Sequence, residues 1–395
     1  MRLASVVGAR PQFVKLGPVG WTIDAHNLQG SQQESVEHVV FHTGQHYDLM
    51  MSDVFFKEMS LPVPARNLGV GSGPHGQQTG RMLDLLERAF REQQPDAVLV
   101  YGDTNSTLAA ALAAAKLHIP VAHVESGLRS FNKRMPEEIN RVLTDHISTF
   151  LFCPTRQAVK NAQAEGFTNA VGDGELVPVG DPCGGVRCSA DTPVVINVGD
   201  VMYDVFLRAS DDARAQSGIL RRLGLQQGRY ALVTVHRSEN TDNPVRLRGI
   251  LEGLRLLAAD GLQVVLPMHP RTRNALSSLQ TPLDLSDVDV IDPVGYLDMI
   301  ALEDSAGVIL TDSGGVQKEA YFCRVPCVTL RDETEWVELV QAGWNRLAGA
   351  EPSAIHRAVR RALDEDQPGD ELRLYGDGQA AERVVGALTK WWDCG

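Results

Sequence analysis

Apolar residues along the chain come in short, β-branched runs that alternate with longer stretches of helical periodicity. Strands are predicted in the first half at residues 3–7, 38–42, 97–101, 121–124 and 150–153. In the second half they are predicted at residues 230–235, 263–267, 288–291, 307–310 and 327–330. Strands that alternate with helices are typical of a parallel sheet with crossover helices. The pattern therefore predicts an α/β fold.

Helices in the first half are predicted at residues 80–92, 104–117, 137–148 and 157–165. In the third of them, a helical stripe that faces the core is expected from Ile139, Val142, Leu143 and Ile147. Residues 172–193 are rich in Gly, Pro and Asp and have no periodicity, so they are predicted to form an irregular loop. The pattern assigns no function to this loop.

A chain of 395 residues is too long for one ordinary core and suits two domains. We expect residues 1–195 and 196–375 each to form a doubly wound, Rossmann-like domain. A last helix within residues 376–395 is expected to pack back on the first domain. The expected architecture is two such domains that face each other across an interdomain cleft.

Composition and charge narrow the class of protein. The chain is 43 % hydrophobic and 22 % charged, as in globular proteins. Arg10 and Pro11 end the apolar start of the chain, which argues against a membrane span and a signal peptide. Six scattered cysteines fit a reduced, cytoplasmic protein. The net charge of −13 disfavours nucleic acid or an anionic membrane as the main partner.

Polar residues gather where the predicted strands end. In open α/β sheets, ligands bind beyond the carboxyl ends of the strands. Polar segments directly after predicted strands occur at residues 8–15, 43–46, 102–105, 123–127, 236–240, 269–271 and 311–315. One such segment would mean little, because turns are polar in most proteins. Polar segments after strands in both halves of the chain predict a single site in the interdomain cleft.

Three carboxylates are candidates for proton transfer. Asp103 and Glu125 each follow a predicted strand, and Glu137 begins a predicted helix. Carboxyl groups whose environments separate their pKa values can remove and return a proton. The structural alternative is helix capping for Asp103 and Glu137, whereas Glu125 has no such role in the pattern. Glu137 and Arg141 are also spaced to pair on one face of the helix.

Residues 312–319 follow a predicted strand, open a helix and contain two glycines. Backbone N–H groups at such a helix start can hold an anion such as a phosphate. The alternative is an ordinary helix cap by Asp312 or Ser313. Glu319, one to two turns into the helix, could accept ribose hydroxyls or face solvent.

The first predicted strand is not followed by the G-x-G-x-x-G pattern, so a bound NAD is not expected. Arg10 and Lys15 follow that strand and are candidate phosphate partners. The alternative for both is an ordinary surface cation.

Histidines near strand ends are expected to bind phosphate or sugar, with one or two of them structural: His42, His46, His123, His236 and His269. None of them has the spacing of a metal-ligand pair on one element, and Cys183 and Cys188 lack a second ligand pair. No metal is therefore expected.

Jointly, these motifs resemble those of the non-hydrolysing UDP-N-acetylglucosamine 2-epimerases, bacterial and archaeal enzymes related to the GT-B glycosyltransferases. The matching segments follow family order and are residues 8–15, 43–48, 102–107, 123–129, 136–141, 236–240 and 311–319.

The resemblance implies a GT-B-like fold, a homodimer and inversion at C2 of a UDP-sugar by elimination and re-addition of UDP, without a cofactor. It implies that the catalytic groups are Asp103, Glu125, Glu137, Arg141 and His236. The UDP-binding residues that it implies are Arg10, Lys15, Ser313, Gly314, Gly315 and Glu319. We expect His269 and Met299 to contact the substrate as well.

The chain departs from the family pattern at two places that bear on function. Met299 stands where many relatives place an aromatic residue near the uracil, so stacking is weaker or comes from a neighbour. Bacterial relatives that are regulated by their own substrate carry a basic residue in the segment that corresponds to residues 75–79. This chain lacks it there. Together with Tyr47 and Asp48, this resembles the archaeal branch and argues against such activation.

Other functions stay open at the level of sequence. One is a 2-epimerase of UDP-2,3-diacetamido-2,3-dideoxyglucuronate, whose C6 carboxylate would call for a further cation. The others are a hydrolysing epimerase, a glycosyltransferase of the same architecture that uses a UDP-sugar, and a non-catalytic sensor of nucleotide sugars.

Overall fold

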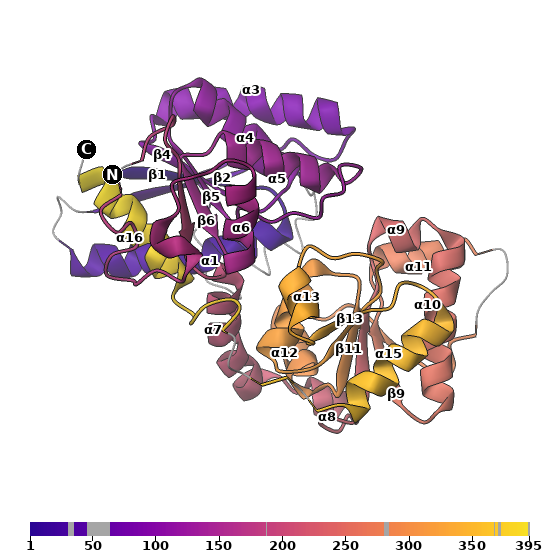
Figure 1. The fold of residues 1–395 in the computed structure, drawn as a ribbon. Helices are drawn as coiled ribbons and strands as arrows, with labels where there is room; N and C mark the ends of the chain where they lie inside the picture. The colour runs from indigo at the N-terminus through magenta and orange to yellow at the C-terminus, as the bar shows by residue number, and fades with distance from the viewer. Residues whose placement is uncertain are drawn as a thin grey trace. The chain divides into compact units, whose positions relative to one another are not determined.

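The computed structural model describes residues 1–30, 35–45, 64–186, 188–279, 284–366, 368–369 and 373–393. The chain forms two compact units, each with its own sheet (Figure 1). Unit 1 contains Met1–Val205 and Arg373–Gly395, and unit 2 contains Phe206–Leu372. The chain passes from one unit to the other within helix α7 (Val201–Gln216).

Unit 1 contains a parallel sheet with the strand order β3-β2-β1-β4-β5-β6-β7. Its strands are β1 (Arg2–Val7), β2 (Glu37–His42), β3 (Arg66–Asn67), β4 (Ala97–Tyr101), β5 (Val121–Val124), β6 (Phe150–Cys153) and β7 (Val194–Asn197). Strands β2 and β3 are added on one side of β1, and the next strand in the chain, β4, pairs with the other side of β1. This is the doubly wound arrangement, and it confirms the predicted α/β fold of this half.

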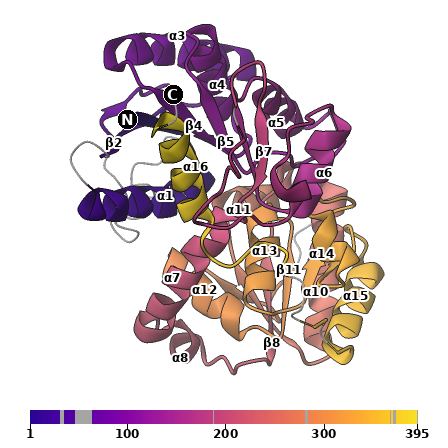
Figure 2. The ribbon, with the colours of Figure 1, turned by 60° about the vertical axis from the view of Figure 1, so that its left-hand side comes forward.

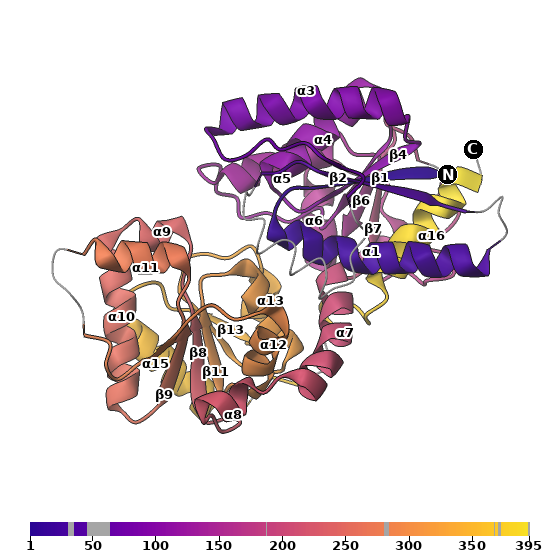
Figure 3. The ribbon, with the colours of Figure 1, turned by 180° about the vertical axis from the view of Figure 1, so that it is seen from behind.

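Helices cover both faces of this sheet: α1 (Arg10–Gln29), α3 (His75–Gln93), α4 (Asn105–Lys116), α5 (Pro136–His146), α6 (Arg156–Ala164) and α16 (Ala380–Asp393). Helices α3, α4 and α5 lie on one face, and α1 and α16 on the other (Figures 1 and 3). Val6 and Val98 of the sheet pack with Met82 of α3 and Ala110 of α4. Helix α16 packs against α1, so the end of the chain completes unit 1 (Figure 2).

The predicted core stripe of α5 is wrong at Ile139 and Leu143, which are 46 % and 48 % exposed, whereas Ile147 packs against the core. Glu138, Arg141 and Asp145 of the same helix are buried instead. Charged side chains can be buried where they form ion pairs, as these three do.

Of the described strands, β3, β7 and β13 were not predicted from the sequence. They are two to four residues long, and periodicity is least informative for such short runs. The loop at residues 172–193 follows a 3-10 helix, η2 (Val171–Gly174), and contains an isolated bridge between Ser189 and Thr192.

Unit 2 contains a second parallel sheet with the order β10-β9-β8-β11-β12-β13, which reverses between β8 and β11. Its strands are β8 (Tyr230–Thr234), β9 (Gln263–Pro267), β10 (Asp289–Ile291), β11 (Val308–Thr311), β12 (Cys327–Thr329) and β13 (Asn345–Leu347). This sheet is therefore also doubly wound, as predicted.

The helices of unit 2 are α8 (Ile219–Leu223), α9 (Ser238–Thr241), α10 (Pro244–Ala259), α11 (Pro270–Ser277), α12 (Tyr296–Ser305), α13 (Gly314–Phe322), α14 (Val337–Gln341) and α15 (Pro352–Asp364). Val233 of β8 faces a core made with α10 and α15, and its neighbour Leu232 faces a core made with α8 and α12. Alternate residues of a strand point to opposite faces, so one apolar run supplies both cores.

Within the described ranges, the structure has no helix that is both long and apolar enough to cross a membrane.

Candidate active site

The expected site residues of unit 1 lie where the strand order of its sheet reverses. Strand β1 runs into the start of α1, and its neighbour β4 runs into the turn that precedes α4. Strand β5, on the other side of β4, ends directly before Glu125. In doubly wound sheets, ligands bind at this reversal, beyond the carboxyl ends of the strands.

Glu125 and Lys15 form an ion pair at this edge, and each side chain is only 9 % exposed. The backbone of Glu125 has φ of 69°, a left-handed conformation that is unusual for a residue with a side chain. Gly102 lies directly against the pair: a Cβ on it would stand 3.1 Å from Lys15 Nζ and 3.3 Å from Glu125 Oε2. Gly102 also has φ of 62°, so the position favours glycine for two reasons.

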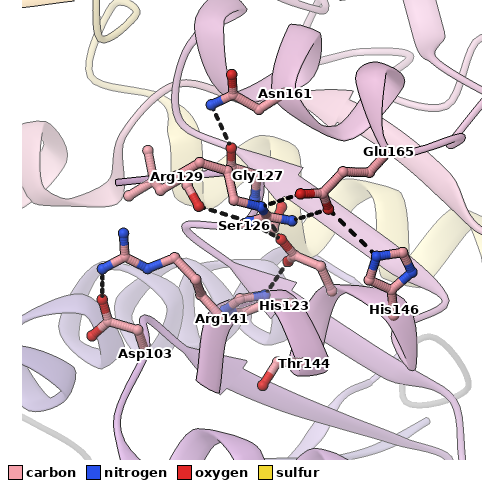
Figure 4. Close-up of polar contacts among 12 residues, drawn as sticks. Asp103, His123, Ser126, Gly127, Arg129, Arg141, Thr144, His146, Asn161 and Glu165 are labelled. Atoms are coloured by element: carbon pink, nitrogen blue, oxygen red, sulfur yellow. Dashed lines mark hydrogen bonds and ion pairs between the residues drawn. The ribbon is translucent and has the colours of Figure 1, made fainter. Parts of the chain in front are cut away.

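Asp103 follows Gly102 and forms an ion pair with Arg141 of α5 (Figure 4). Its side chain is 32 % exposed, and its backbone carbonyl accepts a hydrogen bond from Asn140 Nδ2 at 2.9 Å. The N-cap of α4 is Thr104, whose hydroxyl accepts from the backbone N–H of Thr107. The Asp103 carboxylate is therefore not used as the helix cap that was its structural alternative.

Glu137 is partly exposed in the first turn of α5. The expected ion pair with Arg141 does not occur among the described residues. Arg141 is turned into unit 1 instead, where it contacts Asp103 and Glu138. Glu138 is buried and also accepts hydrogen bonds from the backbone of Ser130 and Phe131. The two neighbouring acids thus differ, and Glu138 has the structural role.

Gln12 shapes the opening loop, a role that the sequence pattern did not reveal. Its side-chain oxygen accepts from the N–H groups of Gly8 and Ala9, and its nitrogen donates to the carbonyl of Tyr101. This buried amide joins the end of β1 to the end of β4. The side chain of Arg10, a predicted phosphate partner, lies outside the described parts, as do His46, Tyr47 and Asp48.

His42 and His123 are both in the interior of unit 1. His42 Nδ1 accepts from the backbone N–H of Gly44 at 2.7 Å, and its ring packs on Phe13. Burial lowers the pKa of His42, so this ring is neutral near pH 7. These contacts make His42 structural, as expected for one or two of the histidines.

In unit 2, the candidate residues lie at the second reversal of strand order, after β8 and β11. The buried Asp312 accepts hydrogen bonds from the backbone N–H groups of His236 and Arg237 and from Asn240 Nδ2. Asp312 therefore holds the loop after β8 and leaves the helix cap to its neighbour. This role of Asp312 could not be read from its place in the motif, because its partners are more than 70 residues away.

His236 and His269 lie side by side, with ring centroids 5.3 Å apart. Burial lowers the pKa of His236, and the Asp312 carboxylate opposes this effect only in part. The imidazole of His236 is therefore neutral near pH 7 and can donate from one nitrogen only. His269 begins α11, where its Nδ1 accepts from the N–H of Arg271.

Ser313 is the N-cap of α13, and its hydroxyl accepts from the N–H of Val316. A Cβ on Gly314 would stand 2.6 Å from Glu335 Oε1, so the close approach of this loop requires glycine there. A Cβ on Gly315 would meet nothing closer than Ser313 Oγ at 3.8 Å. The helix start is therefore packed at Gly314 and open at Gly315.

Glu319 is buried on α13, and Glu303 of α12 is completely buried. Burial and the nearby charge of Glu319 raise the pKa of Glu303 well above its ordinary value, which favours the neutral form of this acid. Met299, on the same helix as Glu303, packs against an apolar core of unit 2 together with Val294.

Within the described ranges, the structure shows no group of three His, Cys, Asp or Glu residues that could hold a metal ion. Two cavities, of about 360 and 520 Å³, open beside residues 170–193 in unit 1. Neither of them is lined by a predicted site residue.

The chain matches the family model described as UDP-N-acetylglucosamine 2-epimerase over residues 29–389. It is 46 % identical to the UDP-2,3-diacetamido-2,3-dideoxy-D-glucuronate 2-epimerase of Pseudomonas aeruginosa, covering 99 % of this chain and 100 % of the relative. It is 44 % identical to a UDP-N-acetylglucosamine 2-epimerase homolog of Methanococcus maripaludis, covering 98 % and 99 %.

Among solved structures, the chain is similar to the UDP-GlcNAc 2-epimerase of Methanocaldococcus jannaschii in complex with UDP-GlcNAc and UDP. The TM-score is 0.82 and the identity is 38 %, over 99 % of this chain and 100 % of the other. This likeness confirms the GT-B-like architecture of two Rossmann-like sheets.

Proposed function

The chain belongs to the UDP-N-acetylglucosamine 2-epimerase family, and from that membership we propose that it reversibly inverts C2 of UDP-N-acetylglucosamine to give UDP-N-acetylmannosamine. The observation that carries the proposal is the pair of acids at one sheet edge, Asp103 and Glu125, each held by a cation. Acids held in this way can exchange a proton with a carbon centre without any redox step.

The proposed reaction is an elimination followed by an addition. A base takes the C2 proton, the C–H electron pair forms the C1=C2 double bond, and the C1–O bond breaks so that UDP leaves with its electrons. The bound intermediates are 2-acetamidoglucal and UDP. A proton then adds to the other face of C2, and UDP returns to C1. No hydroxyl is oxidised, so the reaction requires no nicotinamide.

In this proposal, Asp103, Glu125 and Glu137 carry the protons of the reaction. The hydrogen at C2 is barely acidic, so charge stabilisation at the departing diphosphate is needed as well. Arg141 and neutral His236 act near the diphosphate and the sugar.

UDP is proposed to bind at the carboxyl edge of the second sheet. The space around Gly315 at the start of α13 supports a phosphate site there, because the N–H groups of a helix start and the helix dipole attract an anion. The proposed contacts with the UDP-sugar are Arg10, Lys15, His269, Met299, Ser313, Gly314, Gly315 and Glu319. We also propose that the two units close over the sugar, because a reactive glycal must be kept from water.

A second substrate, UDP-2,3-diacetamido-2,3-dideoxyglucuronate, is favoured by the relative from Pseudomonas aeruginosa, which is 46 % identical over nearly the whole chain. The two candidate sugars share the C2 acetamide and the UDP leaving group, so the same acids would serve both. They differ at C3 and C6, where the second sugar adds an acetamide and a carboxylate. A comparison of kcat/KM for the two sugars decides between them.

Incubation with each UDP-sugar in heavy water, followed by NMR, tests the proposal. The expected product from UDP-N-acetylglucosamine is UDP-N-acetylmannosamine with solvent deuterium at C2. Retained protium at C2 would exclude the elimination mechanism. Release of free N-acetylmannosamine would indicate a hydrolysing enzyme, and turnover of neither sugar would favour a glycosyltransferase or a sensor.

We further propose that the protein works as a cytoplasmic homodimer. Light scattering of the purified protein measures the mass directly, and a mass of 43.0 kDa would show a monomer instead. Fractionation of the source cells tests the location.

A further inference from the structure

His123 is completely buried in unit 1, and both of its ring nitrogens lie within hydrogen-bond distance of an acceptor. Nδ1 lies 2.6 Å from Asp145 Oδ1, and Nε2 lies 2.7 Å from the carbonyl oxygen of Gly102. His123 therefore links the Asp145 carboxylate to the Gly102 carbonyl.

Asp145 is the ionised partner in this arrangement. Burial alone would raise the pKa of Asp145, but the charges and hydrogen bonds of His123 and Arg129 outweigh burial and lower it. The carboxylate also accepts from the N–H of Gly127 at 3.1 Å and from Arg129 Nη1 at 2.7 Å. An acid with so many donors around it is held in its charged form.

Arg129 extends the array to Glu165, which it binds through two nitrogens at 2.8 and 2.6 Å. In the array of His123, Asp145, Arg129 and Glu165, the buried Asp145 carboxylate and the buried Arg129 guanidinium are paired with each other, and Arg129 is also paired with Glu165. Opposite partners of this kind make the burial of these charges compatible with a stable fold.

The inner end of the array meets the turn that carries the proposed acids. The Gly102 carbonyl belongs to the peptide that leads into Asp103, and the Asp103 carbonyl is held by Asn140. Both peptides beside the Asp103 α-carbon are therefore anchored. The α-carbon of Gly102 also lies against the pair of Lys15 and Glu125.

The array also holds the chain on the far side of Glu125. Asp145 binds the N–H of Gly127, and Asn161 binds its carbonyl at 3.0 Å. Glu125 itself is held in a left-handed conformation. A strained backbone of this kind persists only where its surroundings hold it in place.

We propose that His123, held between Asp145 and the Gly102 carbonyl, is a positioning residue that fixes Asp103 and Glu125 for the proposed chemistry at C2. The expected effect on exchange at C2 rests on the proposed function. The placement of Asp103 and Glu125 by His123 does not depend on any substrate. The reaction needs its acids within hydrogen-bond reach of C2, and a misplacement of about 1 Å can cost about 10²-fold in rate.

Two measurements test this role. In a crystal structure of the His123→Phe variant, the Gly102 carbonyl should turn away from its wild-type direction. The kcat for exchange at C2 should fall by about 10²-fold or more, with a small change in UDP affinity.

Asp145→Asn is the second test variant, because it keeps the shape of the side chain and removes the negative charge beside His123 Nδ1. Asp96→Asn is its matched control. Asp96 also accepts a backbone N–H, that of Arg2 at 2.6 Å, but it lies at the other end of β4. We expect Asp145→Asn to lower kcat for exchange and Asp96→Asn to leave it unchanged, even where both lower the melting temperature.

The outcomes separate this inference from the proposed function. An unmoved Gly102 carbonyl in His123→Phe overturns the inference whatever the activity. Equal kcat values for Asp145→Asn and wild type overturn it as well. If wild-type protein turns over neither sugar while the carbonyl moves in His123→Phe, the proposed function fails and the positioning geometry stands.

Discussion

The ammonium group of Lys15 and the carboxylate of Glu125 lie against each other at the carboxyl edge of the first sheet, 110 positions apart in the chain. The first comes from the helix after β1 and the second from the end of β5. Each side chain is 9 % exposed, so neither charge is well solvated by water. The pair is held in place by the close approach of Gly102.

Removal of the cation alone should be costly. Lys15→Met leaves the carboxylate of Glu125 buried beside an apolar side chain. Breaking a buried pair in this way typically costs about 3–5 kcal/mol. We expect the free energy of unfolding, measured with urea, to fall by about this amount. The double variant Lys15→Met/Glu125→Gln should recover part of the loss, and no recovery would mean that the two residues do not interact energetically.

Replacement of the proposed acids should stop exchange and preserve UDP binding. Asp103→Asn and Glu125→Gln keep the shape of the side chains but cannot take up a proton at the carboxyl oxygen. General acid and base groups typically contribute about 10²–10⁴-fold in rate. We expect losses of this size in deuterium incorporation at C2, and a UDP affinity close to that of wild type by calorimetry.

Glu137→Gln extends the same experiment to the third proposed acid. Glu137 is partly exposed, so its replacement should not lower the melting temperature. Exchange at C2 is expected to fall as for the other two acids. Should any one of the three variants keep near-normal turnover, the role of that residue is structural.

The two glycines that begin α13 should respond differently to the same change. Gly314→Ala places a methyl group 2.6 Å from Glu335 Oε1, and overpacking of this kind typically costs about 1–3 kcal/mol. Gly315→Ala meets no close atom and removes a flexible residue from a helix, so stability should stay equal or rise by up to about 1 kcal/mol.

UDP binding by the Gly315→Ala variant is the second measurement on these two glycines. A methyl group on residue 315 would stand where a phosphate approaches the backbone. Gly315→Ala should therefore weaken UDP binding in calorimetry without a loss of stability. Unchanged affinity in that variant would contradict a phosphate site at the start of α13.

Glu303 should make the protein less stable as the pH rises. Its pKa is raised in the folded state, so between the ordinary value of 4.5 and the raised value the folded protein binds a proton that the unfolded chain releases. The stabilising effect of that proton is complete below about pH 4.5 and is lost as the pH rises toward the raised pKa.

Glu303→Gln removes this titration and keeps the shape of a neutral acid. Denaturation with urea at several pH values should show that the advantage of the variant over wild type grows from pH 5 toward pH 8. A difference that does not change with pH would show that Glu303 is ionised in the folded protein.

Much of the fold could be predicted because its signals are local. The runs at residues 97–101, 121–124, 150–153 and 263–267 coincide with strands of the structure, since a continuous apolar run between polar turns has few other solutions in an α/β chain. The polar segments that follow the strands could be predicted from the sequence in the same way. A two-residue strand such as β3 carries too few residues for a pattern. Strand β7 is as long as β5 and β6, but its apolar run directly follows the irregular residues 172–193.

The positions of the candidate residues were predicted better than their contacts. Asp103 and Glu125 were expected directly after strands and they lie there, and Lys15 lies in the helix that follows β1. The partners of the charged groups were not foreseen. Arg141 was expected beside Glu137 on the surface of its helix, but it contacts Asp103 in the interior.

The sequence by itself determined two α/β sheets, the order of their strands along the chain and the polar residues at their carboxyl ends, because neighbours in sequence decide these features. Only the tertiary structure decided which charge pairs with which, because the partners come from separate strands and helices. Ile139 and Leu143 face outward, since the buried ion pairs of Arg141 and Asp145 govern the orientation of α5. The partners of His123 were decided in the same way, because the fold brought the Asp145 carboxylate and the Gly102 carbonyl to its two ring nitrogens.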